Sequence, residues 1–314
     1  MALGYRRPVA SADDDHPETV DSPIRAGCTT PDGVGIATYD FGGDGPDLLL
    51  VHATGFCATV LGPLAGSLTG EFHCWGLDLR FQGHSDRPAS AGFDWSGFAT
   101  DVLTVVDHLG LDRPYGVGHS CGGASLLLAE QRHPGSFRAF YAFEPVVLPA
   151  PPAPASIDNN PLSRGALRRR QTFPSRTDAF VNFSAKPPFD RLDSDALQAY
   201  IDDGFELVPT EEGGDGQTVR LCCRREDEAQ IYAHGASHDA YVRLPEVAIP
   251  VALSCGADTD SFGPGLLAAV ADRLPSATVD VLPGLGHFGP MERPAEVGAA
   301  VRRTFRSRAD TAPS

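Results

Sequence analysis

The sequence predicts an α/β protein built on a mainly parallel, doubly wound sheet, with a helical segment inserted into it. Short apolar runs of strand type alternate with segments whose apolar residues recur at helical spacing, as in strands joined by crossover helices. The alternation stops at a run of Pro and Ala over residues 149–154 and resumes near residue 241. A chain of 314 residues is long enough for one large α/β domain with such an insertion.

The first elements follow from local patterns. The acidic, polar stretch over residues 1–23 predicts a disordered tail. An Asp-Gly turn between the runs 24–30 and 36–40 predicts a β-hairpin. The continuous apolar run 47–51 is typical of a strand that is buried on both faces of a parallel sheet.

The alternation continues on both sides of the insertion. Strands and helices take turns, which predicts right-handed crossovers and a sheet that is covered on both faces. The predicted elements are strands at 73–79, 114–117, 137–143, 250–254 and 277–282, and helices at 94–111, after residue 120, at 264–274 and at 295–305.

Residues 150–240 are predicted to form the insertion. Its Pro-rich start breaks regular structure, and helical patches follow at 165–173, 177–183, 195–205 and 226–234. We expect a helical cap over the carboxyl ends of the strands, where open α/β sheets bind ligands. The core is then made of residues 24–149 and 241–306, and residues 307–314 are expected to fray.

Composition limits the class of partner. The formal net charge of −16 argues against nucleic acid and against an anionic membrane surface. There is no run of 18 apolar residues and no secretory signal, and the seven cysteines follow neither a zinc spacing nor a disulfide framework. We therefore expect a cytoplasmic protein that acts on a small molecule, without a metal. The sequence does not indicate an oligomeric state.

Residues 118–122 read Gly-His-Ser-Cys-Gly and lie between a predicted strand and a predicted helix. This strand–turn–helix context is what a nucleophile elbow requires, because the tight turn needs small residues on both sides of the serine. We therefore interpret Ser120 as a nucleophile. The amide of Cys121, at the start of the helix, is placed to stabilise an oxyanion. His119 is expected to shape the substrate side of the turn.

A serine nucleophile needs a base, and the base needs an orienting acid. His287 lies in the segment Pro-Gly-Leu-Gly-His-Phe-Gly-Pro (283–290), which directly follows a predicted strand. Glycines on both sides allow the loop to bring the imidazole close to the serine. We predict that His287 is the base.

With these motifs, residues 24–305 resemble the α/β-hydrolase superfamily, in its serine-nucleophile form with an inserted cap or lid domain. The segment Asp-Leu-Arg-Phe-Gln-Gly-His-Ser-Asp (78–86) is similar to the family's Asp-x-Arg-Gly-x-Gly-x-Ser pattern, with Phe81 where the family has Gly. The resemblance implies the α/β-hydrolase fold, the chain order serine, acid, histidine, and no cofactor.

Two carboxylates compete for the role of the acid. Most family members place it after the strand that follows the cap, where Asp260 fits the family's Gly-x-x-Ser/Thr-Asp pattern, and we prefer it. Glu144, at the end of the strand that follows the serine helix, is the alternative, because certain dehalogenases and lactonases place the acid there. A carboxylate that ends so apolar a strand needs a partner or water.

The loop after the 47–51 strand reads His-Ala-Thr-Gly-Phe (52–56). By analogy with the His-Gly-x motifs of the family, the amide of Thr54 is the second oxyanion donor, alongside the amide of Cys121. Phe56 is expected to wall the acyl pocket.

The insertion carries five arginines: Arg164, Arg168, Arg169, Arg170 and Arg176. Because these arginines recur at helical spacing, we expect some of them to face the site and bind a substrate carboxylate or phosphate. Arg168 is our candidate for this substrate-binding role. The alternative is a solvated helix face whose arginines pair with acids of the insertion.

These residues predict an esterase or lactonase, a serine hydrolase that cleaves a small ester or lactone through an acyl-enzyme. The same triad also serves acyl transfer, perhydrolysis, C–C bond hydrolysis and lyase chemistry. A non-catalytic receptor is a third hypothesis, and the intact set of serine, histidine and acid counts against it. Dehalogenases and epoxide hydrolases of this fold are excluded, because they use Asp where this chain has Ser120.

Overall fold

The computed structural model describes residues 24–88, 92–149, 153–209 and 216–309. The predicted tail over residues 1–23 lies outside the described residues. So do residues 150–152 of the predicted linker and residues 310–314 at the C-terminal end.

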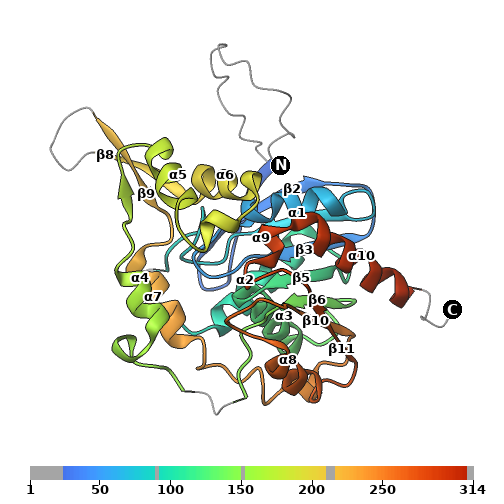
Figure 1. Ribbon diagram of the computed structural model, residues 1–314. Coiled ribbons are helices and arrows are strands. Elements are labelled where there is room, and N and C mark those ends of the chain that lie inside the picture. Colours follow the sequence, from blue (N-terminus) through green and yellow to red (C-terminus); the bar gives the residue numbers. More distant parts are fainter. Residues whose placement is uncertain (1–23, 89–91, 150–152, 210–215, 310–314) are drawn as a thin grey trace.

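An eight-stranded sheet forms the centre of the molecule, in the order β1-β2-β4-β3-β5-β6-β10-β11 (Figure 1). β2 runs antiparallel to β1 and β4, and the pairs from β4 onward are parallel. The mainly parallel sheet is therefore confirmed. The strands are β1 (Ile24–Thr29), β2 (Gly35–Gly42), β3 (Asp47–Val51), β4 (His73–Leu77), β5 (Tyr115–His119), β6 (Phe140–Phe143), β10 (Val251–Gly256) and β11 (Ala277–Leu282).

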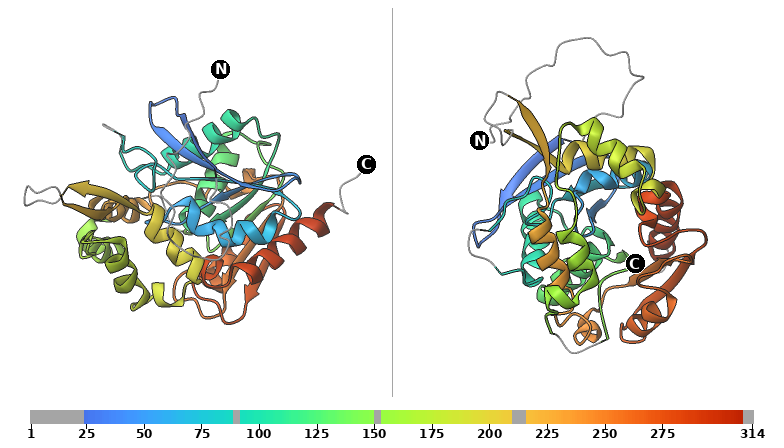
Figure 2. Two further views of the ribbon diagram at one scale, coloured as in Figure 1. Left: turned by 90° about the horizontal axis from the view of Figure 1, so that it is seen from above. Right: turned by 60° about the vertical axis from the view of Figure 1, so that its left-hand side comes forward.

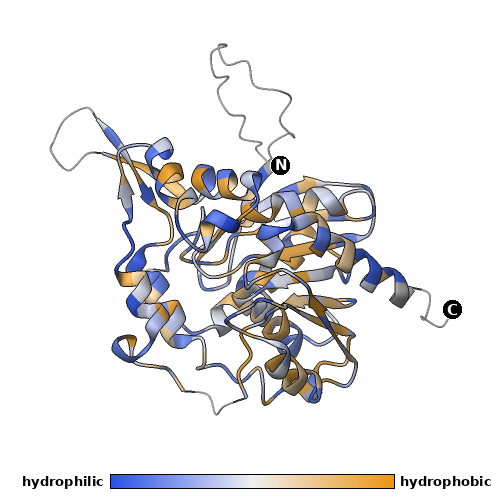
Figure 3. Cartoon of the chain, in the orientation of Figure 1, coloured by the Kyte–Doolittle hydropathy of each residue, from blue (hydrophilic) through white to orange (hydrophobic). Residues whose placement is uncertain are grey.

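Helices cover both faces of this sheet (Figure 2). Residues of α2, α3 and α8 join one buried apolar cluster, and residues of α1 and α10 join another. β3 contributes Leu49 and Val51 to the first cluster and Leu48 and Leu50 to the second, so it is buried on both faces, as its apolar run predicts. Figure 3 colours the chain by hydropathy, and apolar residues are frequent in the central sheet. The α-helices of the core are α1 (Gly62–Leu68), α2 (Ser96–Leu109), α3 (Cys121–Arg132), α8 (Pro264–Ala271), α9 (Gly289–Glu292) and α10 (Pro294–Ala309).

The insertion contains helices and also a small sheet. Strands β7, β9 and β8 pair antiparallel in that order. The predicted helical cap thus also holds strands that the sequence analysis did not include. The pairing of β7 with β9 joins residues almost 50 positions apart, which local patterns do not reveal. The elements are α4 (Pro161–Leu167), β7 (Thr172–Phe173), α5 (Arg176–Ser184), α6 (Ser194–Asp203), β8 (Phe205–Pro209), β9 (Gln217–Leu221) and α7 (Arg225–His234).

Several predicted boundaries shift. The helical patch 195–205 splits, because α6 ends at Asp203 and Phe205 begins β8. α1 has no counterpart among the predicted elements. α10 continues to Ala309, past residue 306, where the core was expected to end. None of the helices in the described part of the chain is both long and apolar enough to cross a membrane.

Candidate active site

Ser120 lies in the sharp turn between β5 and α3. Its backbone has a φ of 54° and a ψ of −113°, in a region that residues other than glycine rarely adopt. A Cβ on Gly122 would lie 2.1 Å from the carbonyl oxygen of Val51, and one on Gly118 would lie 2.6 Å from the backbone of Gly123. Only glycine at these two positions lets the turn pack this closely against β3 and the start of α3.

Cys121 is the first residue of α3. The first amides of a helix have no acceptor within the helix, so the Cys121 amide is available at the position that the elbow motif predicts. Burial raises the pKa of its thiol to about 12. The neutral side chain packs in the core.

Glu144 leaves the sheet beside Ser120. His119 lies opposite Phe143 in the parallel pair of β5 and β6, so the next residues of these strands emerge at the same edge. The amide of Ser120 donates to the carbonyl oxygen of Phe143 at 2.9 Å. Glu144 also has a positive φ, of 45°, and it is fully buried.

Four donors surround the Glu144 carboxylate. Oε1 accepts from the amide of Gly256 at 3.1 Å. Oε2 accepts from the hydroxyl of Thr259 at 2.8 Å, the amide of Phe262 at 3.2 Å and Nδ1 of His287 at 2.7 Å. These hydrogen bonds satisfy a carboxylate that has no access to water.

His287 lies in the loop that follows β11, as predicted. With Nδ1 donating to Glu144, Nε2 on the other side of the ring is the acceptor, which is the tautomer that a base requires. His287 and Ser120 line the same cavity. The loop turns at Gly284, whose φ is 71°, a conformation that favours glycine.

The geometry corrects our preference for Asp260 as the acid. Its side chain is exposed, and its Oδ1 accepts from the hydroxyl of Ser261 at 3.2 Å. The loop 256–262 instead supplies three of the four donors to Glu144. This loop therefore holds the carboxylate that contacts the histidine, and Asp260 only lines the cavity.

His119 does not take the expected place on the substrate side. It is buried, and it is not among the described residues that line the cavity. Its Nε2 donates to the carbonyl oxygen of His287 at 2.8 Å. Burial, with the neighbouring His287, holds the pKa of His119 well below its ordinary value, so the ring is neutral and this bond uses its single N–H. His119 thus contacts the backbone of the loop that carries His287.

Thr54 and Phe56 line the cavity together with Ser120, where the sequence places them. The Phe56 ring packs 5.7 Å from the ring of Phe288, centroid to centroid. The loop is tied to the core because the amide of Gly55 donates to Oε1 of Gln82 at 2.7 Å. Gln82 has no sequence signal for this role except its place in the 78–86 segment.

The cavity has a volume of about 750 Å³ and is lined by both the core and the insertion. This volume suits a small organic molecule. Apolar side chains make up much of its wall, namely those of Phe56, Trp95, Val146, Leu148, Phe189, Phe262 and Phe288.

Arg169, and not Arg168, lines this cavity. Arg168 is exposed. Nη1 of Arg169 lies 2.5 Å from Oε2 of Glu228 on α7, and Nη2 donates to the hydroxyl of Tyr200 at 2.5 Å. Helical spacing could not select between them, because α4 ends at Leu167 and both arginines follow it.

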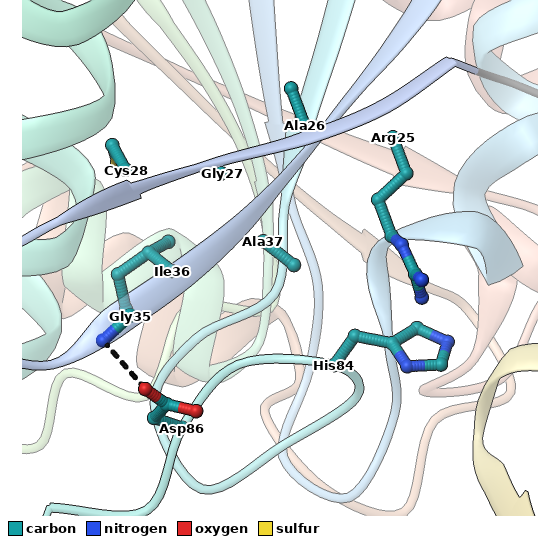
Figure 4. Close-up of a pocket in the computed structure, with 9 residues that line it drawn as sticks. All are labelled: Arg25, Ala26, Gly27, Cys28, Gly35, Ile36, Ala37, His84 and Asp86. Carbon is teal, nitrogen blue, oxygen red and sulfur yellow. Dashed lines mark hydrogen bonds between the residues drawn. The ribbon is translucent and has the colours of Figure 1, made fainter. Parts of the chain in front are cut away.

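A shallower hollow of about 290 Å³ lies over β1 and β2 and shares no lining residue with the larger cavity (Figure 4). Arg25, His84 and Asp86 line it, and Asp86 accepts from the amide of Gly35 at 3.1 Å. Nε2 of His84 lies 3.3 Å from Oδ1 of Asp203, which does not line the hollow. In the described ranges, no three or more His, Cys, Asp or Glu side chains are grouped to hold a metal ion.

Comparisons with known proteins agree with this architecture. A model of the Alpha/beta hydrolase family matches residues 48–300. A 2-(acetamidomethylene)succinate hydrolase from Mesorhizobium japonicum is 24% identical over 248 residues, which cover 78% of this chain and 83% of that protein.

Two solved structures share the fold. The crystal structure of E-2-(acetamidomethylene)succinate hydrolase superposes with a TM-score of 0.72 and 22% sequence identity. The match covers 89% of this chain and 98% of that chain. A malate-bound thermophilic esterase from Thermogutta terrifontis superposes with a TM-score of 0.67 and 20% sequence identity. The match covers 90% of this chain and 98% of that chain.

Proposed function

The chain belongs to the α/β hydrolase family, and on this premise we propose that it is a serine hydrolase of small esters or lactones. The contact between Glu144 and His287 at 2.7 Å, in a cavity that Ser120 also lines, carries the proposal. The hydrolase names of the relatives favour hydrolysis over acyl transfer, perhydrolysis and lyase chemistry.

The reaction proceeds in two steps. Oγ of Ser120 attacks the acyl carbon while Nε2 of His287 takes the hydroxyl proton, and the bond to the leaving alcohol breaks as His287 protonates that oxygen. Water then attacks the acyl-serine and gives its proton to His287, which passes it to Oγ as the carboxylic acid leaves. Glu144 orients the ring and stabilises the imidazolium that forms in each step.

The amides of Thr54 and Cys121 hold the oxyanion of each tetrahedral intermediate. They approach from different elements, the loop after β3 and the start of α3. The clash that a Cβ on Gly122 would make with Val51 indicates how closely these two elements pack.

The insertion acts as a cap in this proposal. Phe189 and Tyr232 belong to it and line the same cavity as Ser120, so a bound substrate is enclosed from both sides. The relatives' names point to dicarboxylates, a succinate derivative and malate. The cavity is large enough for a small ester or lactone. Whether it accepts a substrate with a carboxylate depends on the charges of the residues that line it.

The test is labelling with a fluorophosphonate probe, combined with mass spectrometry and the hydrolysis of p-nitrophenyl acetate and butyrate. We expect a stoichiometric adduct on Ser120 in the wild type, no adduct in Ser120→Ala, and a burst of p-nitrophenol in the wild type only. A wild-type protein that is folded and takes no label overturns the assignment and favours the receptor hypothesis.

A further inference from the structure

We infer that the Arg169–Glu228 pair forms a polar subsite that binds an uncharged hydroxyl or amide group of the substrate. The inference rests on the proposed function, because it names the substrate class of the same cavity. The subsite would therefore select substrates with a neutral polar group over substrates with a second carboxylate.

The pair lies directly against the loop of the proposed oxyanion donor. A Cβ on Gly55 would lie 2.8 Å from Oε1 of Glu228 and 3.3 Å from Nη1 of Arg169. Gly55 is the neighbour of Thr54 in the chain, and Thr54 lines the cavity together with the pair. A substrate group that reaches the pair is therefore close to the reacting carbonyl.

The side chains of the pair keep hydrogen-bonding capacity. A guanidinium has five N–H donors, and the Arg169 contacts to Glu228 and Tyr200 use one N–H on each of two nitrogens. A carboxylate has about four acceptor positions, and Glu228 accepts from Arg169 on Oε2 and from the hydroxyl of Tyr232, which leaves further positions. Burial raises the pKa of Tyr200 and Tyr232, so both remain neutral hydroxyls.

Such a pair offers a donor and an acceptor side by side. A hydroxyl or a carboxamide matches both, since it accepts from Arg169 and donates to Glu228. An alkyl group in the same place makes neither hydrogen bond, and it covers the remaining N–H groups and lone pairs of the ion pair without replacing their contacts to water, which is costly.

The charge of the wall argues against a substrate carboxylate. Arg169 is already paired with Glu228, and Arg191 is paired with Glu292 at 3.1 Å. Among the described lining residues the acids outnumber the arginines by two, because Asp258 and Asp260 add to the two glutamates. An anion would meet neutralised arginines and two further carboxylates in a partly desolvated space.

The first test uses the wild-type enzyme with three methyl esters of similar size: methyl butanoate, methyl 3-hydroxybutanoate and the monomethyl succinate anion, followed by titration of the released acid. We expect kcat/KM for the hydroxy ester to exceed both others by about 10- to 100-fold. Equal values for the hydroxy and plain esters, or a preference for the succinate ester, overturn the subsite.

The second test changes the pair. In the double variant Arg169→Met/Glu228→Met, which leaves no unpaired buried charge, the hydroxy-over-plain ratio is expected to fall toward one. Glu228→Gln, which keeps the shape, is measured beside it and is expected to lose most of the ratio. A ratio that survives in either folded variant makes the pair a structural brace within the insertion and overturns the subsite.

The matched control is Arg220→Met/Glu206→Met, which removes a partly exposed pair between β8 and β9 of the same insertion. The ratio should stay at its wild-type value. Fluorophosphonate labelling of Ser120 in the wild type and in each variant separates the two proposals. A labelled wild type that does not prefer the hydroxy ester, or a labelled pair variant that keeps the preference, counts against the subsite alone. A folded wild type that takes no label counts against the proposed function.

Discussion

Nδ1 of His287 and Oε2 of Glu144 lie 2.7 Å apart although 143 positions separate them in the chain. Glu144 directly follows β6 and Ser120 directly follows the neighbouring strand β5, so sheet pairing puts the acid next to the nucleophile. The loop after β10 closes the arrangement by donating to the same carboxylate. The acid is thus positioned by the end of a strand and held by hydrogen bonds from the end of β10 and the loop that follows it.

The first prediction concerns this carboxylate. Glu144→Gln keeps the shape of the side chain but removes the charge that stabilises the imidazolium and selects the ring tautomer. We expect kcat to fall by about 10³- to 10⁴-fold with little change in KM, measured with p-nitrophenyl butyrate. Asp260→Asn is the matched control, and it is expected to reduce kcat far less. The reverse order of the two losses would restore Asp260 as the acid.

The second prediction concerns His119, a positioning residue that acts through the backbone of His287. His119→Phe removes the hydrogen bond to the His287 carbonyl and keeps a ring in the core. We expect kcat to fall about 10-fold with KM nearly constant, since a looser base misplaces its proton transfer. His119→Gln, which carries an N–H₂ donor, should recover part of the loss. Equal losses in Phe and Gln would show that the ring shape, and not the bond, matters.

The third prediction concerns the elbow. In Gly122→Ala the added Cβ meets the carbonyl of Val51 at 2.1 Å, and backbone cannot yield as a flexible side chain does. We expect a loss of about 3 kcal/mol or more in the free energy of unfolding, or no folded protein, by urea denaturation. Gly66→Ala in α1 is the control. It has open space around it, so it should be neutral or stabilising by up to about 1 kcal/mol. A stable Gly122→Ala enzyme would contradict this packing.

The parts of the site that local sequence predicts are Ser120 and His287. Each lies in a short motif whose glycines have a local steric reason, and the backbone angles at Ser120 and Gly284 bear this out. Their roles in catalysis stay predictions until Ser120 is labelled.

The acid and the cap contacts are not local. Asp260 satisfies a sequence pattern, but the choice of Glu144 depends on which strands are neighbours and on how the 256–262 loop folds back over β6. Arg169 and Arg168 differ by one step around a helix end, and only packing against Glu228 on α7 selects between them.

Phe81 illustrates a sequence departure with a structural cost. The related pattern has Gly there, and Phe81 adopts a φ of 70°, which a side chain disfavours. Its ring stacks on Phe93 at 4.5 Å between centroids and is buried in the core. Burial of an aromatic ring contributes about 1.5–3 kcal/mol, which offsets the roughly 1–3 kcal/mol of such strain.

The last prediction concerns pH and the hairpin between β1 and β2. A hydrogen bond from Arg80 lowers the pKa of Asp32 from 3.8 to about 2, and Arg80 also binds the buried Asp101. A carboxyl whose pKa is lower in the folded state stabilises the protein above the unfolded pKa and loses this effect as the pH falls through the folded pKa. The stabilising effect of Asp32 is therefore complete above about pH 4 and decreases toward pH 2.

Urea denaturation of the wild type and Asp32→Asn at pH 6 and at about pH 2.5 measures this effect. The Asp32 side chain is 48% exposed, so solvent screening limits the difference at pH 6 to about 1 kcal/mol. That difference should shrink at the lower pH, because Asp32 of the unfolded chain is then protonated while most folded molecules keep the carboxylate, so unfolding takes up a proton and is favoured. Asp112→Asn, which removes an exposed carboxylate, should show no such change. A difference that is constant or grows as the pH falls would mean that Arg80 holds the hairpin through Asp101 and the backbone, without the charge of Asp32.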